Sequence, residues 1–239
     1  MSYRKLLAVA AIALVSIGSV ARADESNAFQ GATITLSWGS GNSWTLPIPG
    51  STDGSPEYSV PDGSQSTSGW TLTWSNVYFN ADPVVAGVFA VTNNTGVTQT
   101  YSLNVLMPTA FATGGSTTIS GGSAISVVDA NASGGMTMSA TSGSSIYTAK
   151  VNGVGVRTLF DDPYTLSNPP PFATSDNLNY GPEAGPNVAF LNNIGIDHSF
   201  TLSPGDQATV NSVFVIVPEP TTMSLLVLGS VFVLRRKTR

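Results

Sequence analysis

The sequence predicts an all-β protein, an antiparallel β-sandwich of the immunoglobulin-like or jelly-roll-like kind. A signal helix is expected before it and a short hydrophobic helix after it. Apolar residues of the body recur at every second position, which is the spacing of half-buried strands. The intervals are rich in Gly, Asn, Ser and Pro, which favour turns. No body segment has amphipathic helical spacing, so one sheet must cover another.

Three runs show the alternation most clearly, at residues 33–38, 70–74 and 100–107. In each run, Thr, Ser or Asn residues separate large apolar residues, as expected for a strand with one buried face. Beyond the second run the apolar parity shifts from even to odd positions. This shift predicts a bulge near Ser75-Asn76.

Turn chemistry connects these strands. Asn152-Gly153 separates two strand-like runs and readily adopts the positive backbone angles of a tight hairpin. Residues 93–96 are expected to link two strands, and residues 203–206 to form the turn before a last strand at 208–217. The proline-rich stretch 161–187 is expected to be a long surface loop.

The N-terminus has the layout of a signal peptide. Arg4 and Lys5 precede an apolar run at residues 6–20, and Ala21 and Ala23 supply the small residues of a signal-peptidase site. We expect signal peptidase to cleave after Ala23.

The C-terminus combines a short polar motif, an apolar run and a basic end. Pro218, Glu219 and Pro220 precede the apolar residues 221–234, and the chain ends in a basic tail containing Arg235, Arg236, Lys237 and Arg239. As a helix, the run would reach roughly 21 Å, against about 30 Å for a bilayer core. Basic residues beside a span favour the cytoplasmic side, so the body is expected to face outward.

This arrangement resembles the PEP-CTERM proteins, the sorting substrates of exosortase in bacteria with an outer membrane. The resemblance implies a signal peptide at 1–23, a secreted domain at 24–217 and a sorting signal at 218–239. It also implies exosortase as a partner, a transient inner-membrane intermediate, and delivery to the cell surface or an exopolysaccharide matrix. An uncut C-terminal membrane anchor remains the alternative.

Charge is distributed unevenly along the chain. Seven of the nine basic residues lie in the terminal segments, which leaves Lys150 and Arg157 in the body. Residues 24–219 contain all fourteen acidic residues and have a net charge of −12. Such a body would repel phosphate backbones, which excludes nucleic acid as a partner. The absence of cysteine excludes disulfides and thiolate metal sites.

Catalytic patterns are weak, and we expect no enzyme, cofactor or metal site. His198 is the single histidine, and no Gly-x-Ser-x-Gly motif accompanies it. We expect Asp197-His198 to lie in an exposed turn. Asp161 and Asp162 are expected in a solvated turn, and a calcium ion held by them with Asp176 remains open.

The four tryptophans suggest a sugar-binding alternative. Trp70 and Trp74 share a strand face with Leu72 and are expected in the core, whereas Trp44 is expected to be the most exposed. The sequence therefore predicts an exported structural or interaction protein of the extracellular matrix. A carbohydrate-binding module that uses Trp44 is the alternative, and a polysaccharide hydrolase is a third possibility.

Overall fold

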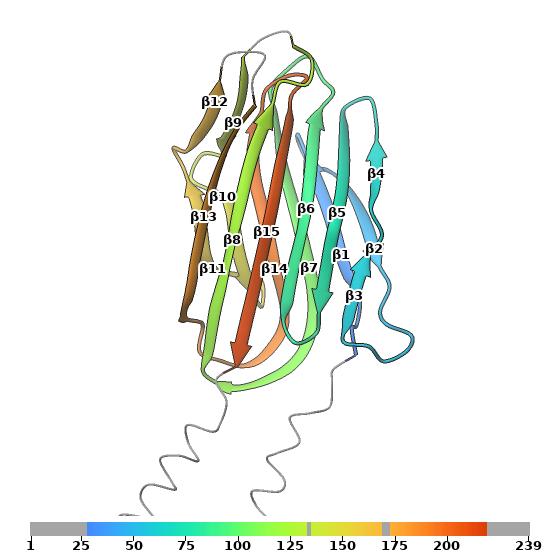
Figure 1. Ribbon diagram of the computed structural model, residues 1–239, viewed down its shortest axis with the longest axis vertical. Helices are drawn as coiled ribbons and strands as arrows, with labels where there is room; N and C mark the ends of the chain where they lie inside the picture. The colour runs from blue at the N-terminus through green and yellow to red at the C-terminus, as the bar shows by residue number, and fades with distance from the viewer. Residues whose placement is uncertain (1–27, 133–134, 169–172, 219–239) are drawn as a thin grey trace, which may run out of the picture.

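Two antiparallel sheets, packed face to face, form the part of the chain that the structure describes (Figure 1). The computed structural model describes residues 28–132, 135–168 and 173–218. These ranges contain fifteen strands and no helix, which confirms the predicted antiparallel β-sandwich. Accordingly, no helix capable of crossing a membrane occurs within them. The expected signal helix and C-terminal helix lie outside the described residues.

The first sheet has eight strands. Its main path runs in the spatial order β11 (Val154–Asp161), β10 (Ser145–Val151), β14 (Val188–Leu202), β7 (Gln99–Gly115), β1 (Ala32–Trp38) and β2 (Asn42–Ile48). Off this path, β9 (Met136–Ala140) pairs with β14, and β12 (Thr165–Asn168) pairs with β9.

The second sheet has seven strands. Its main path runs in the order β13 (Ala173–Ala184), β8 (Thr117–Val128), β15 (Gln207–Pro218), β6 (Val84–Asn93), β5 (Trp70–Asn80) and β3 (Glu57–Val60). The short strand β4 (Gly63–Ser66) also pairs with β5. Residues far apart in sequence therefore lie side by side, as on β8 and β15.

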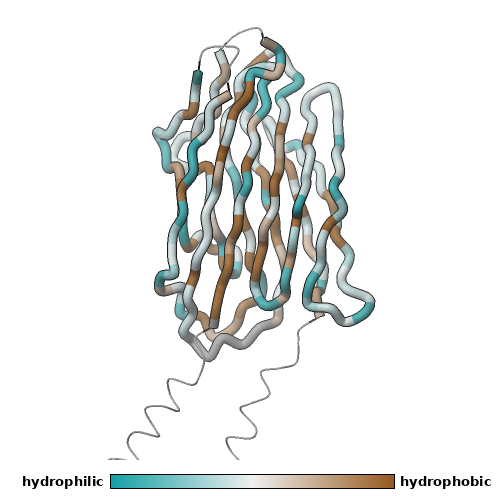
Figure 2. Tube along the Cα trace, viewed as in Figure 1, coloured by the Kyte–Doolittle hydropathy of each residue, from teal (hydrophilic) through white to brown (hydrophobic). Residues whose placement is uncertain are grey.

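The core fills the space between the sheets. Along β6, buried and half-buried residues alternate strictly, and β1 follows the same rule over most of its length. Ile34 and Leu36 of β1 and Leu103 of β7 are completely buried. Figure 2 shows the same alternation of apolar and polar positions along the strands. The period-two pattern thus identified the inward faces correctly, because successive strand residues point to opposite faces.

Local irregularities fall at two predicted positions. Asn152 and Gly153 join β10 to β11 with φ values of 51° and 78°, which confirms the tight hairpin. The register between β5 and β6 shifts between Ser75 and Tyr78, and Asn76 has a φ of 50°, which confirms the bulge.

Two of the connections that carry the chain from one sheet to the other are linked by a buried side chain. Residues 94–98 join β6 to β7, and residues 203–206 join β14 to β15. The buried Asn93 ties them together, because its Nδ2 lies 2.8 Å from the Val97 carbonyl and 3.0 Å from the Leu202 carbonyl. The predicted links are confirmed, and both are crossings between the sheets.

The prediction of a long loop at 161–187 is wrong. This segment contains all of β12 and β13, and residues 169–172 lie outside the described part. An edge strand tolerates proline because one side of its backbone needs no ladder partner. β13 is such an edge, and its register with β8 shifts between Tyr180 and Glu183, where Pro182 lies.

Candidate functional site

Four tryptophans meet at one edge of the sandwich. Trp38 on β1 and Trp44 on β2 come from the first sheet, while Trp70 and Trp74 come from β5 of the second. Ring centroids are 5.0 Å apart for Trp38 and Trp70, 5.9 Å for Trp44 and Trp70, and 6.0 Å for Trp44 and Trp74. These distances are typical of aromatic pairs in contact. We call this continuous row of four indoles the tryptophan edge.

The members of the tryptophan edge differ in exposure. Trp70 is 1% exposed, which confirms its predicted place in the core. Trp74, also predicted in the core, is only half-buried and packs against it, and Trp38 and Trp44 are half-buried too. Trp44 is less exposed than expected. Alternation along β2 turns it toward the space between the sheets, together with Leu46 and Ile48. Three indoles therefore combine core contacts with a surface accessible to solvent.

The indole N–H groups of Trp74 and Trp70 differ in their hydrogen bonding. Trp74 Nε1 donates a hydrogen bond to the Pro61 carbonyl at 3.0 Å, which fixes the orientation of that ring. Trp70 Nε1 is buried without a hydrogen-bond partner. A buried donor without a partner typically costs about 1–3 kcal/mol. The unpartnered donor therefore offsets part of the stabilisation that burial of the Trp70 ring provides.

Neutral polar side chains on the same strands pair with one another. On β4 and β5, the hydroxyls of Ser66 and Thr71 lie 2.7 Å apart, and Asn94 Nδ2 donates to Thr71 Oγ1 at 3.0 Å. On the two strands of the first sheet, the hydroxyls of Thr35 and Thr45 lie 3.0 Å apart. Alternation along the strands turns Thr71, Thr35 and Thr45 to the outer faces of the two sheets, opposite to the inward-facing indoles.

His198 is buried in the middle of β14, so the prediction of an exposed turn at Asp197-His198 is wrong. The strand continues through this pair and turns the imidazole inward, where it is 0% exposed and 5.8 Å from the Tyr147 ring. Burial lowers the pKa of His198 to about 4, against smaller opposing effects of the Ile146 backbone and the Asp197 charge. A neutral, enclosed imidazole does not reach a substrate in solvent.

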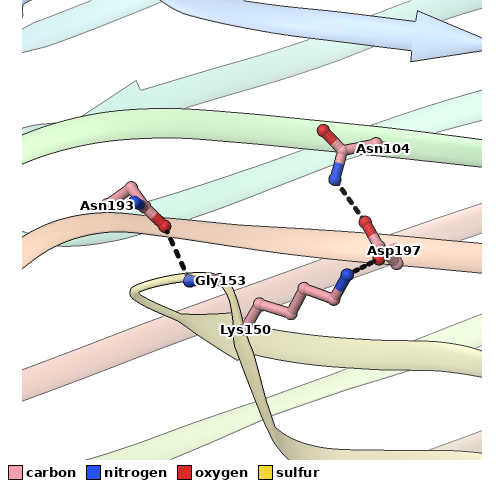
Figure 3. Close-up of polar contacts among 5 residues, drawn as sticks. All are labelled: Asn104, Lys150, Gly153, Asn193 and Asp197. Atoms are coloured by element: carbon pink, nitrogen blue, oxygen red, sulfur yellow. Dashed lines mark hydrogen bonds and ion pairs between the residues drawn. The ribbon is translucent and has the colours of Figure 1, made fainter.

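Asp197 points to the opposite face of β14, where it contacts side chains of the two neighbouring strands. Figure 3 shows its carboxylate between Asn104 of β7, whose Nδ2 donates to it, and Lys150 of β10, which forms an ion pair with it. Nearby, the Gly153 amide donates to Asn193 Oδ1 at 3.1 Å, which holds the β10–β11 hairpin against β14. The one lysine among the described residues is thus engaged in a structural contact.

The acidic residues considered for catalysis or calcium do not converge. Asp161 accepts a hydrogen bond from Ser145 Oγ at 2.6 Å, and Asp162 accepts one from the Gly143 amide at 3.0 Å. Asp176 accepts a hydrogen bond from the Tyr164 hydroxyl at 2.8 Å. In residues 28–132, 135–168 and 173–218, no three His, Asp or Glu side chains are grouped to hold a metal. The hypothesis of calcium at Asp161, Asp162 and Asp176 is therefore not supported.

The predicted processing residues lie at or beyond the limits of the described chain. Pro218 ends β15 opposite Thr117 of β8. The remaining residues of the predicted processing sites lie outside the described residues: Ala21, Ala23, Glu219, Pro220, Arg235, Arg236, Lys237 and Arg239. Cleavage and sorting at these positions remain predictions.

Comparisons with known proteins give only distant matches. No protein-family model and no curated protein matches the chain. Among solved structures, TmCBM61 in complex with β-1,4-galactotriose has a TM-score of 0.27 and 11% identity, covering 63% of this chain and 88% of that one. The carbohydrate-binding module TmCBM27, described for mannan recognition, has a TM-score of 0.28 and 7% identity, covering 67% and 97%.

A third solved structure is an equally distant match. The module CBM6cm-2 from Cellvibrio mixtus lichenase 5A, in complex with cellotriose, has a TM-score of 0.21 and 11% identity, covering 65% of this chain and 87% of that one. At these TM-scores the matches carry no argument about function. The functional argument therefore depends on this chain's own residues.

Proposed function

We propose that this protein is an exported, non-catalytic protein of the cell surface or extracellular matrix that binds polysaccharide at the tryptophan edge. The observation that carries the proposal is the row of half-buried indoles, in which Trp38 and Trp44 contact the buried Trp70 and Trp74 contacts Trp44. A pyranose ring has an apolar face of C–H groups and a rim of hydroxyls. Half-buried indoles held in place by their neighbours offer such a ring an apolar surface that requires little ordering on binding.

Charge favours a neutral polysaccharide over an anionic one. The body is strongly acidic, and the two basic residues of the described chain are already paired, Lys150 with Asp197 and Arg157 with Glu183. An anionic polymer would meet repulsion and find no unpaired cation among these residues. A neutral glycan avoids both costs.

Export and sorting complete the proposal. The signal-peptide pattern at 1–23 and the resemblance of 218–239 to a PEP-CTERM signal support secretion, recognition by exosortase, and release at the cell surface or into an exopolysaccharide matrix. The described chain begins and ends at the same end of the sandwich (Figure 1). Attachment or processing there would leave the lateral tryptophan edge accessible.

A purely structural matrix role is the second candidate. The specific observation in its favour is that the four indoles contact the core and fill the opening between β2 and β5. Under this alternative, the tryptophan edge would stabilise the sandwich and bind no sugar.

A binding experiment separates the two candidates. We expect the purified protein to be retarded in native gels that contain a neutral polysaccharide such as galactan, mannan or a soluble β-glucan. Trp44→Ala should weaken binding tenfold or more, which corresponds to about 1.4 kcal/mol. Phe190→Ala is the matched control, because Phe190 is an aromatic residue on β14 that is 53% exposed and lies outside the row. Absence of binding by the wild type, or equal binding by Trp44→Ala, would support the structural role.

A further inference from the structure

Two aspartates face each other where β8 ends and β15 begins. The ladder between these strands starts with Val128 opposite Gln207, which places Asp129 and Asp206 across from one another just beyond it. Figure 1 shows this end of β8 and β15 opposite the end at which the described chain begins and finishes. Like charges directly opposite each other on neighbouring strands are destabilising.

The carboxylate of Asp129 lacks a partner. Both of its oxygens are buried, and neither accepts a hydrogen bond. Asp206 is 2% exposed, and its Oδ2 accepts a hydrogen bond from Ser203 Oγ. Burying an ionised carboxylate without a partner is strongly unfavourable. A positive charge beside the two carboxylates would offset this cost.

The described chain has no basic side chain to supply this charge. Its two basic residues, Lys150 and Arg157, pair with Asp197 and Glu183. Burial raises the pKa of Asp206, its Ser203 hydrogen bond opposes the rise, and the charge of Asp129 adds to it. The arrangement therefore favours an external cation.

Asp206 borders a hollow that is open to solvent. Asp206 lines an open hollow of about 560 Å³ together with Asn131, Pro204 and Gly205. The backbone carbonyl of Asp206 accepts a hydrogen bond from the backbone N–H of Asn93 at 2.9 Å. Asn93 also links the β6–β7 and β14–β15 connections, so a ligand at Asp206 would stabilise both of them.

We propose that Asp129 and Asp206 bind a divalent cation of the calcium class. Calcium takes six to eight oxygen ligands and accepts carboxylates together with amide, carbonyl and water oxygens in flexible geometry. The described residues bring no third acidic or histidine side chain to the site, so the other ligands must be of these neutral kinds. Magnesium, which demands near-ideal octahedral geometry, is less suited to two carboxylates at the ends of neighbouring strands.

Thermal unfolding with and without calcium tests this proposal. In excess CaCl2 the melting temperature should rise by about 5 °C or more relative to EDTA, and an equal concentration of MgCl2 should have a smaller effect. Asp129→Asn should abolish the calcium-dependent rise. In EDTA, the same variant should melt above the wild type because the repulsion is removed.

Asp82→Asn is the control, since it removes an exposed carboxylate and should preserve the response to calcium. Calorimetric titration of the wild type with CaCl2 should give one site per chain, which tests the proposal even if a variant fails to fold. No heat of binding, equal shifts with calcium and magnesium, or an unchanged calcium response in Asp129→Asn would each overturn the assignment.

Discussion

The indole of Trp74 lies directly against the backbone of Gly63 on the neighbouring strand. These residues are paired in the β4–β5 ladder, and a Cβ atom at position 63 would lie 2.5 Å from Trp74 Cζ2 and 2.8 Å from its Cε2. The glycine thus provides the space in which the ring lies. The Nε1 hydrogen bond to the Pro61 carbonyl then fixes the ring in contact with Trp44.

Gly63→Ala should therefore displace Trp74 from the tryptophan edge. Real Cβ atoms do not tolerate contacts this short, so the indole must rotate away and lose its hydrogen bond. We expect a loss of about 1–3 kcal/mol in the free energy of unfolding. Tryptophan emission should shift to longer wavelength, and both effects can be measured in one urea titration followed by fluorescence.

Gly69→Ala provides the control for this substitution. Its new methyl group would have its nearest neighbour, Thr67 Oγ1, at 3.9 Å, which is an ordinary contact. Stability and emission should therefore stay close to those of the wild type. An unaltered spectrum in Gly63→Ala would contradict the role assigned to this glycine.

His198 should make the protein less stable in mild acid. Its pKa is about 4 in the folded protein, against 6.5 as the ordinary value in the unfolded chain. Between pH 6.5 and 4 the unfolded chain binds a proton that the folded protein does not. The free energy of unfolding therefore falls as the pH decreases through this window. The loss from this one residue should total about 3 kcal/mol, and above pH 6.5 its contribution is constant.

Urea unfolding at several pH values between 4 and 7 measures this effect. His198→Leu replaces the titrating group with an apolar side chain of similar size. The stability of this variant should therefore depend less steeply on pH. Contributions from carboxylates remain in both proteins and cancel in the comparison. Parallel pH profiles for the two proteins would show that the burial of His198 has no such consequence.

Processing should occur at both ends of the chain. We expect the mature protein to begin at Asp24, and replacement of Pro218, Glu219 and Pro220 by alanine to leave an uncut species in the membrane fraction. Mass spectrometry of both termini, combined with cell fractionation, measures these outcomes. Normal release of the alanine variant would contradict a sorting role for the motif, and an N-terminus that retains Met1 would contradict export.

Much of the fold could be predicted because its signals are local. Alternation in 33–38 and 100–107 identified strands β1 and β7 and their inward faces. Asn152-Gly153 identified the β10–β11 hairpin, and the change of parity beyond Ser75 identified the bulge in β5. Each signal arises between residues that are neighbours in the chain.

Other features could not be predicted because they depend on which strands become neighbours in the sheets. The stretch 161–187 looked like a loop because its prolines conflict with a central strand, whereas at a sheet edge they do not. His198 looked exposed because polar residues flank it, but pairing of β14 with β7 and β10 extends the strand through it. The position of a strand within its sheet determines whether prolines are tolerated and whether the strand continues through a polar pair. The spacing of residues along the sequence does not give that position.

The amino-acid sequence by itself determined the class of fold, the inward face of its clearest strands and its tightest turn, since period-two alternation and turn preferences act over a few residues. Only the tertiary structure decided that Trp44 contacts Trp70 and Trp74 across the two sheets, and that Asp129 faces Asp206. Such contacts depend on the order in which distant strands pair. Many orders are compatible with the same local pattern, and burial and packing across the whole molecule select one of them.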